Sequence, residues 1–339
     1  MDGIKQKETG QDLVSWGTAG KQALIAFSLQ GRSHRQTGTP LQDNHALRIL
    51  PNGWSLAVVC DGVGSKPHSD EGSRIAANAF ADFAVRFFGS YQDAESILNL
   101  LKCAAHHATG EMDREARKNG RSVHDYNTTL HAAVFANGMV YYFHSGDGGI
   151  IALKEDGTFD RLTEPQKDEE YVIPLLNGPS GWVTGTSGTR VQSVLLCTDG
   201  VYDKLSGPVL RKYGDGIDKG ISTFFLNPWC FEDWDKPEHI AGQMKLVFSD
   251  EAEPNDFYQA VARGIAQGEE DKEEEASVFV RDRIYCDNTP LSALQGIQDD
   301  ISVAVIQNTA ERPARQPMDS LKGPDWESIR QQVYGKLYG

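Results

Sequence analysis

Apolar residues along this chain gather mostly into short runs of strand length, separated by Gly, Asn, Asp or Pro. These runs predict β-strands, and they cover residues 22–30, 45–50, 54–60, 128–136, 139–146, 150–157, 191–200 and 301–307. Asn-Gly pairs at residues 52–53 and 137–138 separate neighbouring runs. Because Asn-Gly adopts the two-residue turns that join antiparallel strands, each pair predicts a β-hairpin.

A helical spacing replaces this pattern between residues 69 and 120. One apolar stripe has the spacing i, i+4, i+7, i+11 and consists of Ala76, Phe80, Phe83 and Phe87. A second stripe follows Asp93 and consists of Ile97, Leu100, Leu101, Ala104 and Ala108. Both stripes predict amphipathic helices. Since strands and helices are segregated rather than alternating, the fold class is predicted to be α+β.

Three segments differ from this core in composition. Residues 1–20 are polar and contain Gly, which indicates a flexible N-terminus. Residues 206–296 contain Trp and much acidic sequence. Within them, we interpret the run GEEDKEEEAS at 268–277 as a solvated, mobile segment. Residues 310–339 form a charged tail with one short helical pattern. We therefore expect one domain at residues 21–309, with a variable acidic insert at about 206–296.

Charge and targeting signals narrow the function classes. The 33 Lys and Arg against 48 Asp and Glu give a net charge of −15, which argues against nucleic acid or an anionic membrane surface as a partner. The sequence shows neither a signal peptide nor an apolar stretch of membrane-spanning length. Five scattered cysteines indicate free thiols in a reducing compartment. We therefore expect a cytoplasmic protein.

Aspartates stand next to several apolar runs: Asp43, Asp61, Asp199 and Asp299. Carboxylates that converge at strand ends repel one another unless a cation lies between them. A donor set made only of oxygen favours Mg²⁺ or Mn²⁺ over Zn²⁺. The alternative is that Asp-Gly at residues 61–62 and 199–200 marks ordinary turns. The sequence alone does not show that these aspartates meet.

An ordered set of motifs resembles one family. The set consists of QDN at 42–44, VVCDGVG at 58–64, NTTLHAAVF at 127–135, HSGDGG at 144–149, LLCTDGVYDKL at 195–205 and QDDISVAVI at 298–306. It is similar to the bacterial branch of the protein phosphatase 2C-like (PPM-type) metal-dependent serine/threonine phosphatases. The resemblance implies an αββα sandwich of two antiparallel sheets flanked by helices. It also implies that a metal-activated water hydrolyses phosphoserine and phosphothreonine in proteins, without a phosphoenzyme.

The resemblance further implies a site with two Mg²⁺ or Mn²⁺ ions. The residue matching Asp61 bridges both ions, and the carbonyl matching Gly62 binds one of them. The residues matching Asp199 and Asp299 bind the other ion, and the residue matching Asp43 acts through metal-bound water. We expect Asp299 rather than Asp300 to be the ligand, because it is the first residue of its motif.

A third, weaker ion is implied at the positions of Asp147 and Asp203. The structural alternative is a turn aspartate at Asp147 and a helix N-cap at Asp203. If the third ion binds there, it can position water for protonation of the leaving oxygen. That role matters here because Val63 stands where eukaryotic members of the family often carry a His that could serve as the acid, which many bacterial members also lack.

The chain shows two further departures from the family pattern. The chain has GDGG at residues 146–149 where many relatives have GDSR, and Gly38 stands at the usual position of a phosphate-binding Arg. Arg32, His34 or Arg35 can substitute for that Arg, or all three can be loop surface residues. The insert lies where relatives carry a variable flap, which suggests a role in substrate selection.

The expected function is therefore a protein serine/threonine phosphatase that counters a kinase and acts on phosphorylated protein partners. Two alternatives stay open. The loss of GDSR and of the usual Arg is compatible with a non-catalytic binding or regulatory module of the same fold. Nothing in the sequence excludes a small phosphorylated molecule as the substrate.

Overall fold

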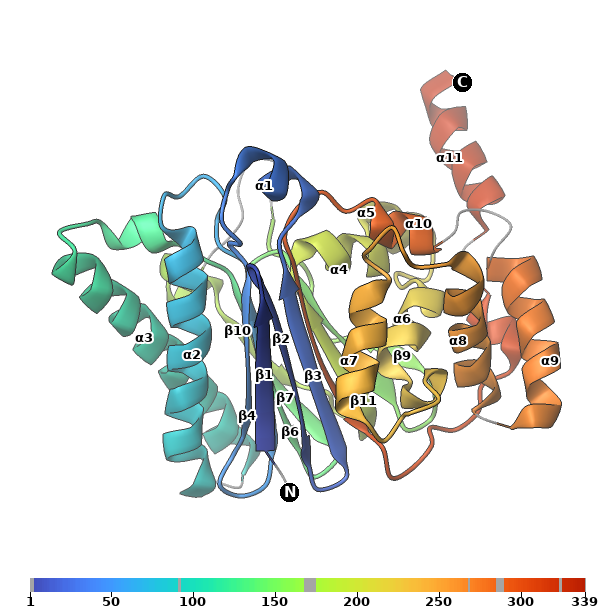
Figure 1. Cartoon of the computed structure of the whole chain (residues 1–339), viewed down its shortest axis with the longest axis horizontal. Helices are drawn as coiled ribbons and strands as arrows, with labels where there is room; N and C mark the ends of the chain where they lie inside the picture. Colours follow the sequence, from blue (N-terminus) through green and yellow to red (C-terminus); the bar gives the residue numbers. More distant parts are fainter. Residues whose placement is uncertain are drawn as a thin grey trace.

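The fold consists of two antiparallel β-sheets that face each other, with helices on both outer sides (Figure 1). It is described by a computed structural model that covers residues 3–90, 93–167, 175–267, 269–284, 290–322 and 325–338. The strand order is β1-β2-β3-β12-β11-β8-β9 in one sheet and β10-β7-β6-β5-β4 in the other. This arrangement confirms the predicted αββα sandwich.

Each of the eight predicted apolar runs overlaps a strand, and the strands at residues 3–9, 12–19, 159–161 and 183–186 were not predicted. The seven-stranded sheet contains β1 (Gly3–Thr9), β2 (Asp12–Ala19), β3 (Gln22–Leu29), β8 (Gly149–Lys154), β9 (Phe159–Arg161), β11 (Val191–Cys197) and β12 (Ile301–Asn308). The five-stranded sheet contains β4 (Asn44–Ile49), β5 (Ser55–Cys60), β6 (Leu130–Ala136), β7 (Met139–Ser145) and β10 (Val183–Thr186). Both predicted hairpins form, since β4 pairs with β5 and β6 pairs with β7 in antiparallel register.

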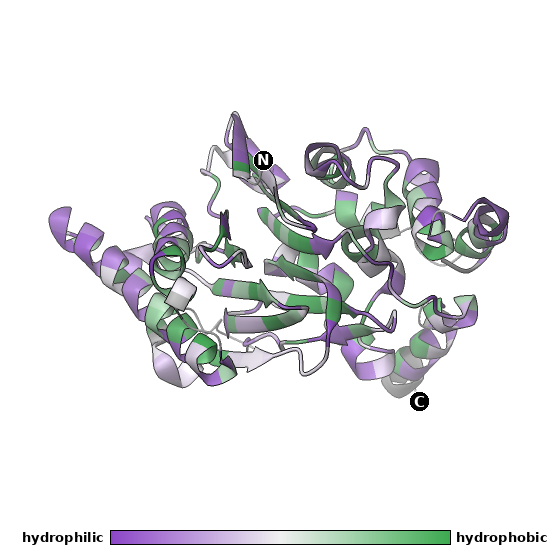
Figure 2. Ribbon diagram, turned by 90° about the horizontal axis from the view of Figure 1, so that it is seen from below, coloured by the Kyte–Doolittle hydropathy of each residue, from purple (hydrophilic) through white to green (hydrophobic). Residues whose placement is uncertain are grey.

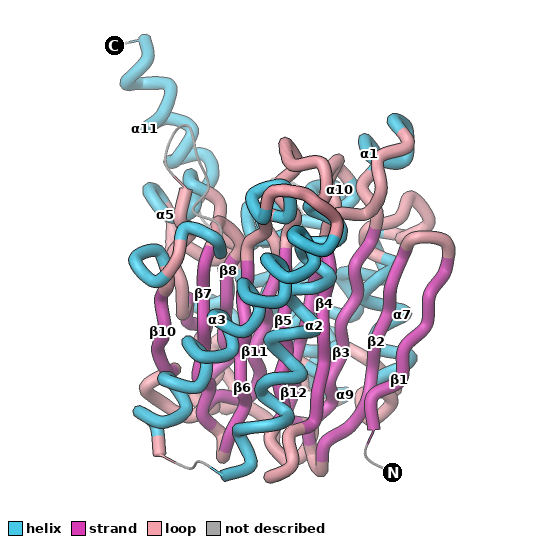
Figure 3. The backbone as a smooth tube through the Cα atoms, turned by 90° about the vertical axis from the view of Figure 1, so that its left-hand side faces the viewer, coloured by secondary structure: helices cyan, strands magenta, loops and turns pink. Residues whose placement is uncertain are grey.

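Two long helices, α2 (Ser69–Phe87) and α3 (Ala94–Lys118), cover the five-stranded sheet (Figure 3). Their predicted apolar stripes pack on that sheet in one core cluster with Val58 and Phe143, except Phe87 at the end of α2, which is 37% exposed. Asp93 caps α3, because its carboxylate accepts a hydrogen bond of 2.9 Å from the backbone N–H of Ser96. The sequence therefore predicted this helical layer and the start of α3.

The other helical layer comes largely from residues 206–296, the segment that was expected to be a variable insert. The helices after β11 are α4 (Asp199–Leu205), α5 (Pro208–Tyr213), α6 (Lys219–Leu226), α7 (Pro237–Leu246), α8 (Pro254–Ala266), α9 (Glu270–Phe279) and α10 (Pro290–Gln295). Phe224 and Phe225 of α6 and Ile240 of α7 share a core cluster with Phe27 and Val303 of the seven-stranded sheet. The segment is thus a structural layer of the sandwich rather than only a flap.

Three apolar clusters hold the four layers together. One lies between α2, α3 and the five-stranded sheet, and another lies between the seven-stranded sheet and the helices after β11. The third lies between the sheets and includes Leu24, Val59, Phe135 and Leu196. Figure 2 shows this distribution, with apolar positions on the strands and on the sheet-facing sides of the helices.

Two expectations about order differ from the structure. Residues 3–19, expected to be flexible, form the hairpin β1–β2, and β2 pairs along its length with β3. The described part of the acidic run at 268–277 lies largely in α9 instead of a mobile segment. Its Ala276 is buried against the core, and acidic residues in the first turn suit the positive end of a helix.

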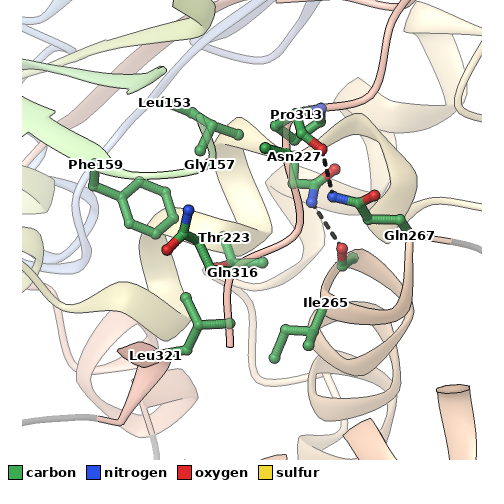
Figure 4. A pocket seen from close by; sticks show the side chains of 12 residues that line it. Leu153, Gly157, Phe159, Thr223, Asn227, Ile265, Gln267, Pro313, Gln316 and Leu321 are labelled. Atoms are coloured by element: carbon green, nitrogen blue, oxygen red, sulfur yellow. Dashed lines mark hydrogen bonds between the residues drawn. The ribbon is translucent and has the colours of Figure 1, made fainter. Parts of the chain in front are cut away.

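The first part of the predicted tail packs against the domain. Gln267 Nε2 donates a hydrogen bond of 2.8 Å to the carbonyl of Pro313, beside a small pocket of about 30 Å³ (Figure 4). The N–H of Ala314 donates to the carbonyl of Glu155 at 2.7 Å. The tail also contains the predicted helix, α11 (Trp326–Tyr338). Among the described residues, no helix is long and apolar enough to cross a membrane.

Candidate functional site

A cavity of about 200 Å³ opens at one end of the sandwich and is lined in part by His34 of the short helix α1 (Arg32–Thr37). Figure 1 shows α1 at that end of the sheets. β5 and β11 end here and β12 begins here, so the antiparallel sheets bring distant motifs to one place. The lining residues are His34, Gln42, Asp43, Asp61, Gly62, Val63, Gly64, Thr129, Asp147, Lys167, Asp199, Asp299 and Asp300. All four aspartates that the strand-end pattern selected are in this set.

Three carboxylates form the centre of the cavity. Asp61, Asp147 and Asp199 each place one oxygen so that these atoms lie within 4.8 Å of one another. Asp61 directly follows β5, Asp147 lies between β7 and β8, and Asp199 begins α4. Oxygens at this spacing can share a divalent cation.

The electrostatics of the cavity also favour a cation. Burial and the charge of Asp300 raise the pKa of Asp43 well above its ordinary value. Burial and the charge of Asp43 do the same to the pKa of Asp61. Burial and the charge of Asp147 raise the pKa of Asp199 to about 6. Each carboxylate therefore resists ionisation in the metal-free protein, and a bound cation would relieve that repulsion.

The backbone around Asp61 is held on two sides. The carbonyl of Asp61 accepts hydrogen bonds of 2.8 Å from the N–H of Thr129 and 2.7 Å from Thr128 Oγ1. Its N–H donates to Thr129 Oγ1 at 3.0 Å. A Cβ on Gly62 would lie 2.6 Å from the carbonyl oxygen of Ser69, so only glycine fits there. The peptide after Asp61 is thereby fixed at the cavity wall.

Thr198 connects Asp43 to β12. Its Oγ1 donates a hydrogen bond of 2.7 Å to Asp43 Oδ2, and the N–H of Ser302 donates to that same Oγ1 at 3.0 Å. Asp43 is only 2% exposed. Thr198 lies within the motif LLCTDGVYDKL, but a Thr before Asp-Gly carries no distinctive signal that marks it as a site residue.

Asp299 and Asp300 differ sharply in their surroundings. Asp300 is buried, and its carboxylate accepts hydrogen bonds of 2.6 Å from the N–H of Gly31 and 2.6 Å from the N–H of Gln42. The Asp299 side chain is 68% exposed and lines the cavity. Asp300 is therefore committed to the backbone, while Asp299 is available to a ligand.

Of the three candidates for phosphate binding, only His34 lines the cavity. Its Nδ1 lies 2.9 Å from Asp300 Oδ1, and its Nε2 lies 3.7 Å from Asp299 Oδ1. Arg32 pairs with Asp250, and Arg35 donates to the carbonyl of Gln30. Neither guanidinium belongs to the described groups that line the cavity.

Lys167 is the cavity residue that the sequence analysis missed. Its Nζ lies 3.0 Å from Asp147 Oδ2 and 3.6 Å from Asp199 Oδ2. Lys167 stands in a polar loop outside all the motifs, so only the three-dimensional structure reveals it. The other proposed third-ion ligand, Asp203, is exposed and is not among the described lining residues.

Comparisons with known proteins identify the family. The family model described as protein phosphatase 2C matches residues 30–219, which is more than half of the chain. A comparison with curated proteins finds no match.

Solved structures with a similar fold include three phosphatases. A bacterial serine phosphatase shares 12% identity at a TM-score of 0.48, covering 85% of this chain and 98% of its own. PppA, a regulatory component of the type VI secretion system of Pseudomonas aeruginosa, shares 14% identity at a TM-score of 0.46. The match covers 84% of this chain and 97% of PppA. The catalytic domain of the phosphatase PstP, in complex with two manganese ions, shares 15% identity at a TM-score of 0.45. The match covers 84% of this chain and 97% of the PstP domain. On the strength of the family-model match, this chain belongs to the protein phosphatase 2C family of serine/threonine phosphatases.

Proposed function

We propose that this chain hydrolyses phosphoserine and phosphothreonine in proteins, using two divalent ions, Mg²⁺ or Mn²⁺, at the cavity beside α1. The observation that carries the proposal is the convergence of Asp61, Asp147 and Asp199, with ligand oxygens within 4.8 Å. Among the described ion pairs, Lys167 contacts Asp147 and Asp199, but no basic side chain pairs with Asp61. The repulsion between Asp61 and its neighbours is therefore left for a divalent cation to balance.

The donor set fits a hard divalent cation. Asp61, Asp199 and Asp299 supply carboxylate oxygens, and the fixed peptide of Gly62 supplies a carbonyl at the cavity wall. Among the described lining residues there is no Cys, and His34 is the only His. A donor set made of oxygens favours Mg²⁺ or Mn²⁺ over Zn²⁺. When bound, such ions lower the pKa of water and neutralise the charge of phosphate oxygens.

The chain's own residues then have separate tasks. Asp61 and Asp199 would hold the cations at the cavity centre, and Asp299, two residues before β12, would complete the ligand set. Thr198 holds one oxygen of Asp43, so the other oxygen can accept a hydrogen bond or a proton from water in the cavity. The negative net charge of the protein repels a phosphate dianion, and bound cations in the cavity would reverse that repulsion locally.

The substrate is proposed to be a phosphorylated protein, with the enzyme countering a serine/threonine kinase. The competing functions are a non-catalytic module of this fold and a phosphatase of a small phosphorylated molecule. They differ in two readouts, metal-dependent phosphate release and preference between peptide and small-molecule substrates.

The test is phosphate release from phosphoserine and phosphothreonine peptides and from a sugar phosphate, in Mn²⁺ and in EDTA. We expect release from the peptides in Mn²⁺, little release in EDTA, and slower release from the sugar phosphate. No release from any substrate would support the non-catalytic module. A preference for the sugar phosphate would overturn the protein substrate.

A further inference from the structure

Hydrogen bonds of the preceding residue, Gln166, position Lys167 at the cavity. The N–H of Gln166 donates a hydrogen bond of 2.8 Å to the carbonyl of Gly146, and Gln166 Oε1 accepts one of 2.9 Å from the N–H of Gly146. Gln166 Nε2 also donates to the carbonyl of Gly181 at 2.7 Å. These contacts tie the Lys167 segment directly to the loop that carries Asp147.

The ammonium group of Lys167 lies against the outer side of the carboxylate cluster. It is 3.0 Å from Asp147 Oδ2 and 3.6 Å from Asp199 Oδ2. Asp147 is 4% exposed, so its charge has little access to water. A buried carboxylate needs a positive partner, and Lys167 supplies one from within the chain.

We propose that Lys167 is a built-in cation that fills the position between Asp147 and Asp199 where a further metal ion would otherwise bind. This inference rests on the metal centre proposed above and goes beyond it. A lysine ammonium and a divalent ion cannot occupy one position against the same oxygens, because their like charges repel at a separation of a few ångströms. The chain therefore carries a permanent positive charge where the family resemblance implied a third, weaker ion.

A permanent ammonium group lowers the concentration of metal that the site requires. An ion held by Asp147 would bind weakly and would be lost at low metal concentration, whereas a lysine remains in place. Removing the ammonium should therefore open a metal position. It should do so without unfolding the protein, because the Lys167 side chain is 51% exposed.

The test counts manganese ions bound per chain by equilibrium dialysis of the full-length, chelator-treated protein at millimolar free Mn²⁺. We expect Lys167→Met to bind one more ion than the parent, and Lys167→Arg to bind the same number as the parent. Adding Asp147→Asn to Lys167→Met should remove the additional ion. Lys236→Met is the matched control, because Lys236 has a similar exposure and pairs with Asp233 away from the cavity.

Two results would overturn the inference. One is an unchanged ion count in Lys167→Met. The other is the loss of a bound ion from the parent on Asp147→Asn alone, because the parent would then already hold a metal ion there. Phosphate release by the parent is measured on the same preparation. It distinguishes failure of the role proposed for Lys167 from failure of the proposed function. A parent that releases phosphate in Mn²⁺ while Lys167→Met gains no ion refutes only the role of Lys167.

Discussion

Asp299 and Asp300 are neighbours in the chain with different tasks in the structure. Asp300 satisfies two buried N–H groups, those of Gly31 and Gln42, whereas Asp299 is open to the cavity. The sequence placed the ligand on Asp299 only because of its position in the motif. The hydrogen bonds of Asp300 now give a physical reason that supports the same choice.

The two aspartates should therefore separate stability from activity. Asp300→Ala leaves two buried donors without acceptors and should lower the free energy of unfolding by about 3 kcal/mol. Asp299→Ala should change that free energy by less than about 1 kcal/mol and should abolish Mn²⁺-dependent turnover. Urea unfolding and phosphate release on both variants check this. Equal losses of stability would contradict the assignment.

His45 predicts a pH dependence of stability. It is 3% exposed, with Nδ1 2.8 Å from Ser28 Oγ and Nε2 2.9 Å from Ser15 Oγ. Burial lowers the pKa of His45 from 6.5 to about 3. Below pH 6.5 the unfolded chain therefore takes up a proton that the folded chain does not. The contribution of His45 to stability is complete above that pH and is lost as the pH falls toward 3.

Between pH 7.5 and pH 5.5 this proton uptake should cost about 1.4 kcal/mol of unfolding free energy. His45→Gln cannot titrate, so its loss of stability over the same interval should be smaller by that amount. Urea unfolding of both proteins at the two pH values measures the difference. The same pH dependence in both would show that His45 does not titrate as its burial requires.

At the scale of elements, patterning predicted the buried strands and α2 and α3 well, because their apolar spacing reflects burial in the core. It could not predict β1, whose residues are almost all exposed and which forms only by pairing with β2. It also missed that residues 206–296 build a layer, because the acidic run of α9 suggested a solvated segment, whereas α6 and α8 bury most of their residues. The four strand-end aspartates were predictable from their motifs. Lys167 reaches the cavity, and Thr198 reaches the carboxylate of Asp43, only through tertiary packing.

The helical layer from residues 206–296 should be essential to the fold. Phe225 of α6 is 0% exposed and stacks near Phe248 in the core against the seven-stranded sheet. Phe225→Ala should lower the free energy of unfolding by about 3–5 kcal/mol. Val209→Ala in α5 is the control, because Val209 is 43% exposed and its loss should cost less than about 0.5 kcal/mol. Urea unfolding compares them, and similar costs would mean that the segment does not support the sheet.

At the scale of the whole molecule, the carboxylate cavity is a source of instability in the metal-free protein. Burial and mutual repulsion raise the pKa values of Asp43, Asp61 and Asp199, so their ionised forms disfavour folding near neutral pH. An ion bound only by the folded state reverses this effect by mass action. At a free concentration one hundred times the dissociation constant, the gain is about 2.7 kcal/mol per site.

Millimolar Mn²⁺ should therefore raise the melting temperature of the chelator-treated protein. Asp61→Asn should show a much smaller increase, because it removes charge from the centre of the cluster. Calorimetric or fluorescence melts with and without Mn²⁺ measure both proteins. A melting temperature that Mn²⁺ does not change would count against metal binding in the cavity.

The most direct test of the account is the rate of phosphate release from a phosphoserine peptide as a function of Mn²⁺ concentration. The comparison is between the parent, Asp61→Asn and the control Asp113→Asn, whose aspartate pairs with Arg117 on α3. We expect Mn²⁺-dependent release from the parent and the control. Asp61→Asn should be slower by at least ~100-fold, equivalent to about 2.7 kcal/mol of transition-state stabilisation. Near-parental release by Asp61→Asn at low Mn²⁺ would contradict the account.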